Sequence, residues 1–336
     1  MSQVQDCCGG RWCLLCDTKR LVLVFSYTFT FPFILSLALV TSPVVTADGW
    51  NPNTATSNQF SISNTRHNLT QSYLADRAGI MNIARNDYGE VCVYCHTPHG
   101  ANRQIDAPLW NRTINQSSYT LYDKPRTLNQ PISQPGPNSL TCLSCHDGTI
   151  AIDSIINMPG SGAYNPAQEA MVNETFLDSW SGPGIGNHWV LGVGTGGGAC
   201  TFCHNANEDF GAPDFTVFTI GTDLRNDHPI GILYPTTMGP DIDFNEPTLN
   251  YTNSAGTGEM TLFDINGNGY PDKNEPRMYS TGDGPEVECA SCHDPHGVPS
   301  AGPGSEFIPS FLRVSNGNVN TGIGDASGLC LTCHVK

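Results

Sequence analysis

The chain has 336 residues, and its Asp and Glu residues outnumber its Lys and Arg residues by 31 to 15, for a formal net charge of −16. Such an acidic chain repels nucleic-acid phosphate, so nucleic-acid binding is excluded as its main role. The 14 cysteines are too many for an ordinary cytosolic enzyme, and their spacing is the first pattern to examine.

The N-terminal segment has the pattern of an export signal. Lys19 and Arg20 precede an apolar run from Leu21 to Val40, and Val45-Thr46-Ala47 is typical of a signal-peptidase site. We therefore predict a signal peptide over residues 1–47. An uncleaved membrane anchor is the alternative, because the apolar run approaches the ~20 residues that span a bilayer. No function is predicted for Cys7, Cys8, Cys13 and Cys16, which precede the run in a segment that a misplaced start codon also explains.

The ten cysteines that follow residue 47 all belong to Cys-x-x-Cys-His motifs. Chance alone gives about 0.02 such motifs in a chain of this composition, so the repetition is not accidental. In this spacing two thiols can bond to the vinyl groups of one haem while the adjacent imidazole reaches the iron. Zinc does not require a His after each second cysteine, and disulfides do not either. We predict five covalent haem c groups, at Cys92/Cys95/His96, Cys142/Cys145/His146, Cys200/Cys203/His204, Cys289/Cys292/His293 and Cys330/Cys333/His334.

The chain has ten histidines, so five remain after the five proximal ligands. One further imidazole per iron would complete bis-histidine coordination and leave no position for a substrate. Met or water at one or two irons is the alternative. The distal candidates are His67, His99, His188, His228 and His296.

His99 and His296 each lie three residues after a proximal His, in Cys-His-Thr-Pro-His-Gly and Cys-His-Asp-Pro-His-Gly. A side chain at this position lies on the proximal side of its own haem, so we expect it to coordinate the iron of a neighbouring haem. His228 precedes Pro229, which favours an extended, preplaced loop. His188 stands beside Trp189, where a packed histidine is an equal alternative.

A second kind of metal site is predicted between residues 264 and 275, which match the fixed positions of a calcium-binding EF-hand loop. Pro271 and Pro276 argue against flanking helices, and an Asn- and Gly-rich turn is the alternative. The candidate Ca²⁺ ligands are Asp264, Asn266, Asn268, the carbonyl of Tyr270, Asp272 and Glu275.

The order of motifs repeats along the chain, which indicates two dihaem-like modules, at about 60–175 and 276–336, separated by an insert at about 176–275. Together they form one pentahaem domain over residues 48–336. The 35 Gly and 24 Pro residues and the poor hydrophobic periodicity predict mainly irregular coil with short α-helices and few short strands. One strand is expected at 215–220, and the haem stack is expected to serve as the core.

These motifs resemble the doubled-CxxCH multihaem c-type cytochrome family, and so do His-Pro-Ile-Gly at His228 and the terminal Cys-Leu-Thr-Cys-His-Val-Lys. The resemblance extends over most of the chain after residue 47. More loosely, the chain is similar to extracellular cytochrome filament subunits, in which haem stacks continue between subunits. The resemblance to this family implies electron transfer rather than enzymatic turnover.

The sequence leaves two functions to compare. The first is an electron carrier in the periplasm or outside the cell, with partners that present basic patches, extracellular electron acceptors, or further copies of the chain in a filament. The second is a multihaem reductase of a small oxidant such as nitrite or a sulfur oxyanion, with one open iron. The spin state of the irons separates the two.

Overall fold

The computed structural model describes residues 61–70, 84–157, 188–192, 199–235, 243–316 and 328–335, except 87, 106, 115–117, 125–129, 208–211, 213, 253–257, 282 and 304. These residues belong to one unit, Val45–Lys336. The predicted signal peptide, residues 1–47, lies outside them. Within the described part, no helix combines the length and the apolar character needed to cross a membrane.

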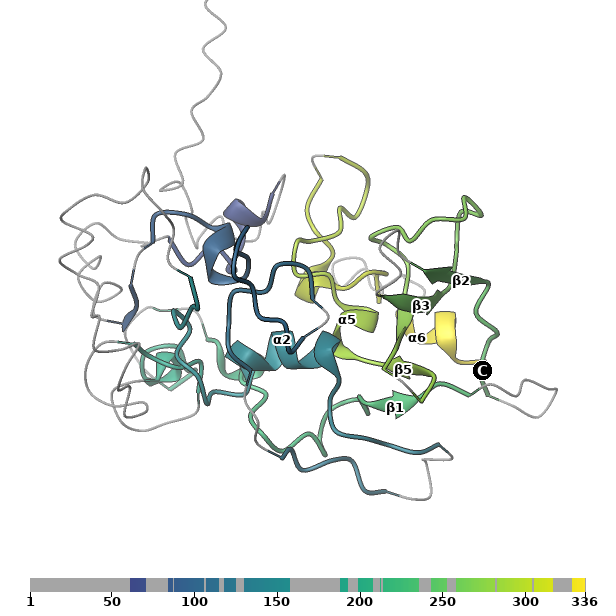
Figure 1. Ribbon diagram of the computed structural model, residues 1–336, viewed down its shortest axis with the longest axis horizontal. Coiled ribbons are helices and arrows are strands. Elements are labelled where there is room, and N and C mark those ends of the chain that lie inside the picture. The colour runs from purple at the N-terminus through teal and green to yellow at the C-terminus, as the bar shows by residue number, and fades with distance from the viewer. Residues whose placement is uncertain are drawn as a thin grey trace, which may run out of the picture. The chain divides into compact units, whose positions relative to one another are not determined.

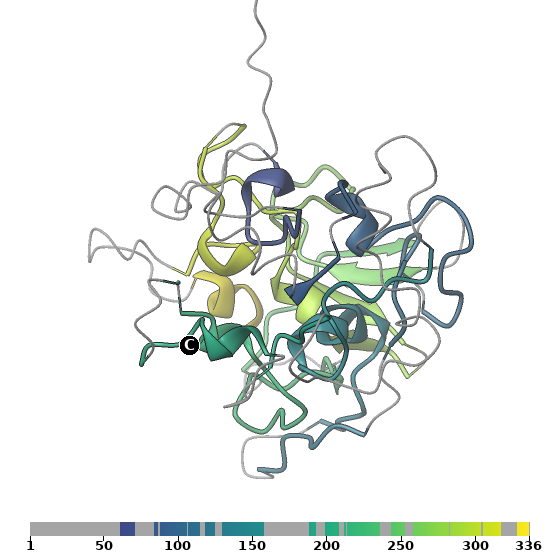
Figure 2. The same ribbon diagram turned by 90° about the vertical axis from the view of Figure 1, so that its left-hand side faces the viewer.

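Most of the described chain is irregular coil, as predicted, and its helices are short (Figures 1 and 2). Abundant Gly and Pro explain this, because both residue types interrupt regular structure. Longest is α2, Pro137–His146, which begins with a proline at a position where no amide donor is needed. The other helical segments are α5 (Cys289–Cys292), α6 (Gly328–Cys333) and the 3₁₀ turns η3 (Ile62–Asn64), η4 (Cys92–Tyr94), η5 (Cys200–Phe202), η6 (Thr216–Phe218) and η7 (Pro309–Phe311).

A small antiparallel sheet is the largest regular element after residue 230 (Figure 1). Its strands are β1 (Ile232–Leu233), β2 (Leu249–Thr252), β3 (Glu259–Leu262), β4 (Arg277–Ser280) and β5 (Pro285–Val287). They lie in the order β1-β5-β4-β3-β2. Strands β2 to β5 pair in sequence, and the β3–β4 connection carries the predicted calcium loop.

The strand expected at 215–220 is wrong. The segment forms the 3₁₀ turn η6, in which Phe218 N donates to Phe215 O at 2.9 Å. Asp214 explains the difference, because its Oδ1 accepts from Thr216 N at 2.8 Å and from Thr216 Oγ1 at 2.7 Å. A side chain that accepts a hydrogen bond from the first backbone amide of the segment favours a turn over a strand, even where apolar and polar residues alternate.

The buried apolar side chains of the described part form small, separate clusters rather than one core. Each cluster adjoins a Cys-x-x-Cys-His motif: Val93 and Tyr94 belong to the first motif, Leu143 to the second, and Cys333 packs against the third cluster. The clusters are Tyr88/Val93/Tyr94/Ile155, Tyr119/Leu143/Leu224 and Tyr234/Phe263/Met278.

Candidate functional site

Each Cys-x-x-Cys-His motif lies on a helical turn. In four of them the histidine amide donates to the carbonyl of the first cysteine, at 2.8 Å for His96, 3.0 Å for His204, 3.1 Å for His293 and 2.8 Å for His334. His146 is instead the last residue of α2. The turn places the two cysteines and the histidine of each motif on one short segment, as the predicted haem attachment requires.

The ten motif cysteines form no disulfide bond with one another in the described structure. Cys145 and Cys203, the second cysteines of the second and third motifs, are both half-buried. Cys203 N donates to Cys200 O at 3.2 Å, and Cys145 O accepts from Gly148 N at 3.4 Å, so both lie on the turn of their motif. The disulfide alternative is thus not seen here, and haem attachment at Cys145 and Cys203 stays a prediction from their spacing.

A short backbone pairing holds the motif at Cys92. Thr97 N donates to Leu109 O at 2.8 Å, and Asn111 N donates to Cys95 O at 2.9 Å. The pairing aligns His96 with Trp110, whose ring lies 6.1 Å from the imidazole in an edge-on arrangement. Strand-like pairing of this kind fixes the imidazole relative to a residue well separated from it in the sequence.

The motifs at Cys289 and Cys330 repeat this pairing. At the former, Asp294 N donates to Phe311 O and Arg313 N donates to Cys292 O, both at 2.8 Å. At the latter, Val335 N donates to Asp243 O at 2.9 Å and Asn245 N to Cys333 O at 2.8 Å. Three of the five motifs therefore share one backbone environment, which the sequence does not reveal because no residue is common to all three pairing segments.

Backbone carbonyls orient three proximal imidazoles. His96 Nδ1 lies 2.9 Å from Pro108 O, His146 Nδ1 lies 2.7 Å from Phe218 O, and His293 Nδ1 lies 2.8 Å from Ser310 O. Because a carbonyl only accepts, Nδ1 carries the proton and Nε2 keeps the lone pair. This is the tautomer that coordinates a metal through Nε2.

Burial also keeps several of these imidazoles neutral. Desolvation is the main cause that lowers the pKa of His146 and of His293. It lowers the pKa of His67 to about 4, against a smaller opposing effect of the carbonyl of Pro295. Neutral imidazole is the form that binds iron, so no proton has to be displaced near neutral pH.

Three pairs of histidine rings lie close together in space. Their ring centroids are 6.0 Å apart for His96 and His296, 6.4 Å for His67 and His146, and 6.5 Å for His228 and His334. With metal–nitrogen bonds of about 2.0 Å, two imidazoles on opposite sides of one metal have centres about 6.3 Å apart. The centroid separations of all three pairs are close to this value.

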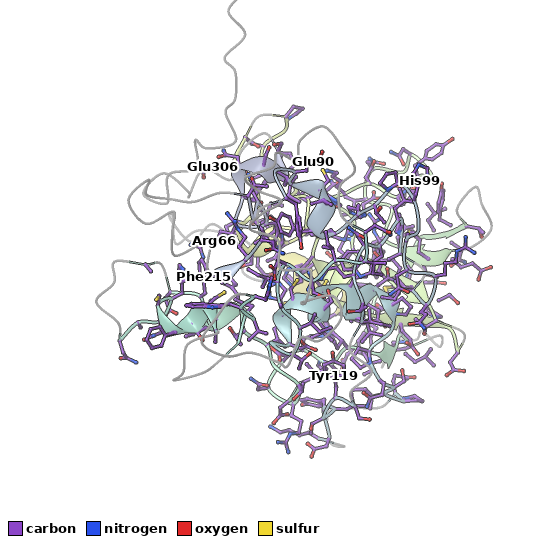
Figure 3. The ribbon with its side chains drawn as sticks, turned by 60° about the vertical axis from the view of Figure 1, so that its left-hand side comes forward. Arg66, Glu90, His99, Tyr119, Phe215 and Glu306 are labelled. Atoms are coloured by element: carbon purple, nitrogen blue, oxygen red, sulfur yellow. The ribbon has the colours of Figure 1, made fainter. Side chains whose placement is uncertain are left out.

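The two remaining distal candidates lie in different environments. His99 is exposed, makes no ring contact with any described residue, and lies at the outer edge of the described part (Figure 3). His188 is buried, and its Nδ1 lies 2.7 Å from Asp153 Oδ2. No second histidine ring contacts His293 in the described structure, so a partner for its iron is not placed there.

The ring of His204 stacks in parallel on Phe215, with centroids 3.9 Å apart. The guanidinium of Arg66 lies over two rings of this segment, 5.0 Å from the Phe215 centroid and 5.3 Å from that of Phe218 (Figure 3). Arg66, near the start of the described part, thus contacts the aromatic residues that lie beside His204 of the third motif.

Burial raises the pKa of several motif thiols. Desolvation raises the pKa of Cys95, Cys200 and Cys333 to about 12 and that of Cys292 to about 11. The nearby thiol of Cys145 adds to the effect at Cys95 and Cys200, so three motifs lie close to one another. In the described ranges, no group of three or more His, Cys, Asp or Glu side chains is placed to hold one metal ion.

Glu288 was not recognised from the sequence, although it joins two of the motifs. Its Oε1 accepts from Gly136 N at 2.9 Å, and its Oε2 accepts from Ser139 Oγ. Ser139 Oγ in turn accepts from Cys289 N at 2.8 Å. Desolvation raises the pKa of this buried carboxyl to about 7. Glu288 thereby connects α2 to α5, and its place directly before Cys289 was the only signal in the sequence.

Arg112 was also missed. Its guanidinium is buried and donates to Ser144 Oγ at 3.1 Å, Ser144 O at 2.8 Å, Ala151 O at 2.8 Å and Ile152 O at 2.7 Å. One side chain therefore fixes the chain after the first motif to the C-terminal half of α2. An isolated arginine gives no sequence signal for such a role.

The predicted calcium loop is a β3–β4 connection rather than a helix–loop–helix. Asp264 Oδ2 accepts from Gly269 N at 2.9 Å, and the buried Glu275 accepts from Ile265 N and Asp272 N, both at 2.9 Å. Gly269 has a φ of +76°, which explains the glycine there. The amide nitrogens of Asn266 and Asn268 donate to Asp272 Oδ2 at 2.6 and 2.8 Å. Amide groups of the loop thus occupy its three carboxylates, which do not form a group placed to hold one metal ion within the described ranges.

No family model matches the chain, and no curated protein matches it. The function is therefore inferred from the motifs and the geometry of the chain itself.

Proposed function

We propose that this chain is an exported pentahaem c-type cytochrome that transfers electrons. The observation that carries the proposal is the spacing of His96/His296, His67/His146 and His228/His334, with ring centroids 6.0–6.5 Å apart. Each pair contains one histidine of a Cys-x-x-Cys-His motif and one that belongs to no motif. Zinc and disulfide sites give no reason for such pairs.

The residues around the motifs suit haem in a further respect. Trp110 Nε1 and Thr219 Oγ1 are buried and have no hydrogen-bond partner within the described structure. Trp110 contacts His96, and Thr219 follows Phe218, whose carbonyl holds His146. Buried donors normally have partners, and the carboxylates of a bound haem are acceptors of the required kind.

Paired histidines favour electron transfer over catalysis. Haem c, when bound, supplies a one-electron centre at each motif. With haem bound, the two histidines of a pair would both coordinate the iron and would leave no position for a substrate. Among the paired histidines, His67 Nδ1 lies 3.1 Å from Pro295 O and His228 Nδ1 lies 2.9 Å from Pro229 O, so we expect these rings to move little when an iron changes charge.

The motifs interlock, which supports closely spaced redox centres. His296 follows the Cys289 motif but pairs with His96 of the Cys92 motif. Glu288 joins α5 to α2, which carries the Cys142 motif. Electron hopping needs neighbouring centres, and haems bound at motifs so arranged would be neighbours. Because the apolar clusters are small, we further propose that the haems form much of the core.

The resemblance to doubled-CxxCH cytochromes supports a periplasmic or extracellular location. A net charge of −16 favours redox partners with basic patches. A filament of this chain, with extracellular electron acceptors, is the more specific form of the proposal, and the exposed His99 is compatible with it. Calcium in the β3–β4 loop is proposed as a structural ion that orders the approach to Cys289.

A multihaem reductase is the second candidate, and one observation favours it. No histidine ring is seen opposite His293 among the described residues, and an iron with one histidine ligand can bind a small oxidant. Nitrite or a sulfur oxyanion would be the substrate class.

One experiment tests both candidates. The purified holoprotein is analysed by intact mass and pyridine haemochrome for haem content, and by EPR of the oxidised state for spin. Five covalent haems per chain, all low-spin, support electron transfer. Fewer than five haems contradicts the proposal, whereas five haems with a substantial high-spin fraction and turnover of nitrite or sulfite favours the reductase.

A further inference from the structure

His188 differs from the other nine histidines in its surroundings. It is 3% exposed, whereas the others are half-buried or exposed. Its backbone φ is +70°, in the left-handed region that residues other than glycine rarely adopt. Such a conformation persists only where the surrounding structure imposes it, and it is concentrated at functional positions.

Asp153 is the residue that holds His188. It is fully buried, and its Oδ2 lies 2.7 Å from His188 Nδ1 and accepts from Asn86 N at 2.6 Å. Its Oδ1 is buried and has no hydrogen-bond partner within the described structure. A carboxylate can only accept, so His188 Nδ1 carries the proton and donates it into this bond. Nε2 then keeps the lone pair through which His188 would coordinate iron.

Most other histidines in the described structure have a backbone carbonyl oxygen at Nδ1. A carbonyl oxygen is a weaker hydrogen-bond acceptor than the Asp153 carboxylate, because it carries no full charge. Backbone carbonyls hold His67, His96, His146, His228 and His293.

Asp294 is the only other carboxylate seen at a histidine ring in the described ranges. It lies 3.2 Å from His296 Nδ1, and the His296 side chain is 49% exposed. The Oδ2 of Asp294 also lies 3.5 Å from Arg313 Nη1, and this cation offsets its charge. Arg313 and the solvent around His296 therefore weaken the effect of Asp294, whereas Asp153 and His188 are both buried.

We propose that Asp153 is a positioning residue that acts through His188, and that the haem coordinated by His188 has the lowest reduction potential of the five. A hydrogen bond from Nδ1 to a carboxylate makes the imidazole a stronger donor, which stabilises ferric over ferrous iron. The pair lies beside the Cys200 motif, because Cys200 N donates to Val190 O at 3.0 Å, two residues after His188. The inference rests on the proposed function.

The test is a potentiometric titration of the full-length holoprotein carrying Asp153→Asn, followed by visible absorption and by EPR. This variant keeps the size of the side chain but removes the charge. We expect the lowest of the five midpoint potentials to shift upward, the other four to stay unchanged, and the EPR signal of one low-spin haem to change. Asp294→Asn is the matched control, for which a smaller shift at a different haem is expected.

An unchanged lowest potential in Asp153→Asn, or equal shifts in the two variants, overturns the inference. Asp153→Glu restores the carboxylate and should return the potential toward that of the wild type. If Asp153→Asn does not incorporate haem, His188→Met replaces it, since a thioether ligand raises the potential of its haem. An unchanged lowest potential in His188→Met also overturns the inference. The wild-type haem content and spin state test the proposed function separately.

Discussion

At the scale of single residues, the atom that hydrogen-bonds to Nδ1 separates the histidines of this chain. A carbonyl or carboxylate at Nδ1 leaves Nε2 as the metal-binding atom, and this arrangement is seen for proximal and distal candidates alike. Counting histidines in the sequence predicts five bis-histidine irons, but only the fold brings His296 close to His96.

Replacing His296 tests that pairing. His296→Ala removes the ring 6.0 Å from His96, so about one fifth of the haem should become high-spin, because one of five irons loses an axial ligand. EPR and absorption spectra of the oxidised holoprotein measure the change. The exposed Glu306→Gln is the control and should stay low-spin, and an entirely low-spin His296→Ala variant would contradict the pairing (Figure 3).

Glu288 predicts a pH dependence of stability. Burial raises its pKa from the usual 4.5 to about 7, so between these values the folded chain holds a proton that the unfolded chain has lost. This contribution is fully present below about pH 4.5 and is lost as the pH rises through 7, at a cost of about 3 kcal/mol.

Urea unfolding of the holoprotein at pH 5 and pH 8 measures this dependence. Glu288→Gln should reduce the difference between the two pH values, because glutamine does not titrate. Glu90→Gln is the exposed control and should leave the difference as in the wild type (Figure 3). An equal pH dependence in Glu288→Gln and the wild type would rule out Glu288 as its source.

At the scale of elements, little regular structure is needed to position the motif residues. Short backbone pairings lie beside three motifs, and the β3–β4 loop joins two short strands. Helical turns place the thiols, and short pairings place the imidazoles. The predicted EF-hand spacing occurs on a hairpin instead of between helices, because β3 and β4 pair directly on either side of the loop. The same spacing of candidate oxygen ligands therefore lies on a hairpin rather than between two helices.

The β3–β4 loop is predicted to bind Ca²⁺. Ca²⁺ should raise the melting temperature of the wild type, by the equivalent of about 2.7 kcal/mol at a hundredfold excess over the dissociation constant, and EGTA should reverse the change. Asp264→Ala should abolish the response. The exposed Asp283→Asn, outside the loop, should keep it. Calorimetric scans with no Ca²⁺ effect on the wild type would exclude the site.

At the scale of the whole molecule, the net charge of −16 governs encounters with other molecules. Electron transfer to a basic redox protein should slow about tenfold between roughly 10 and 150 mM salt, because salt screens the attraction. Stopped-flow oxidation of the reduced protein measures this rate. With an anionic acceptor of similar size the rate should instead rise with salt. A rate that does not change with salt for either acceptor would contradict the prediction that net charge governs these encounters.

The sequence by itself predicted five haem sites and determined the mainly irregular chain, because the Cys-x-x-Cys-His spacing is local and because Gly and Pro act locally. It predicted a strand at 215–220 where Asp214 forms a turn. Only the tertiary structure decided which histidines lie together, that Glu288 joins α2 to α5, and that Asp153 holds His188. These contacts join residues up to about 200 positions apart, and local patterns carry no information on such distances.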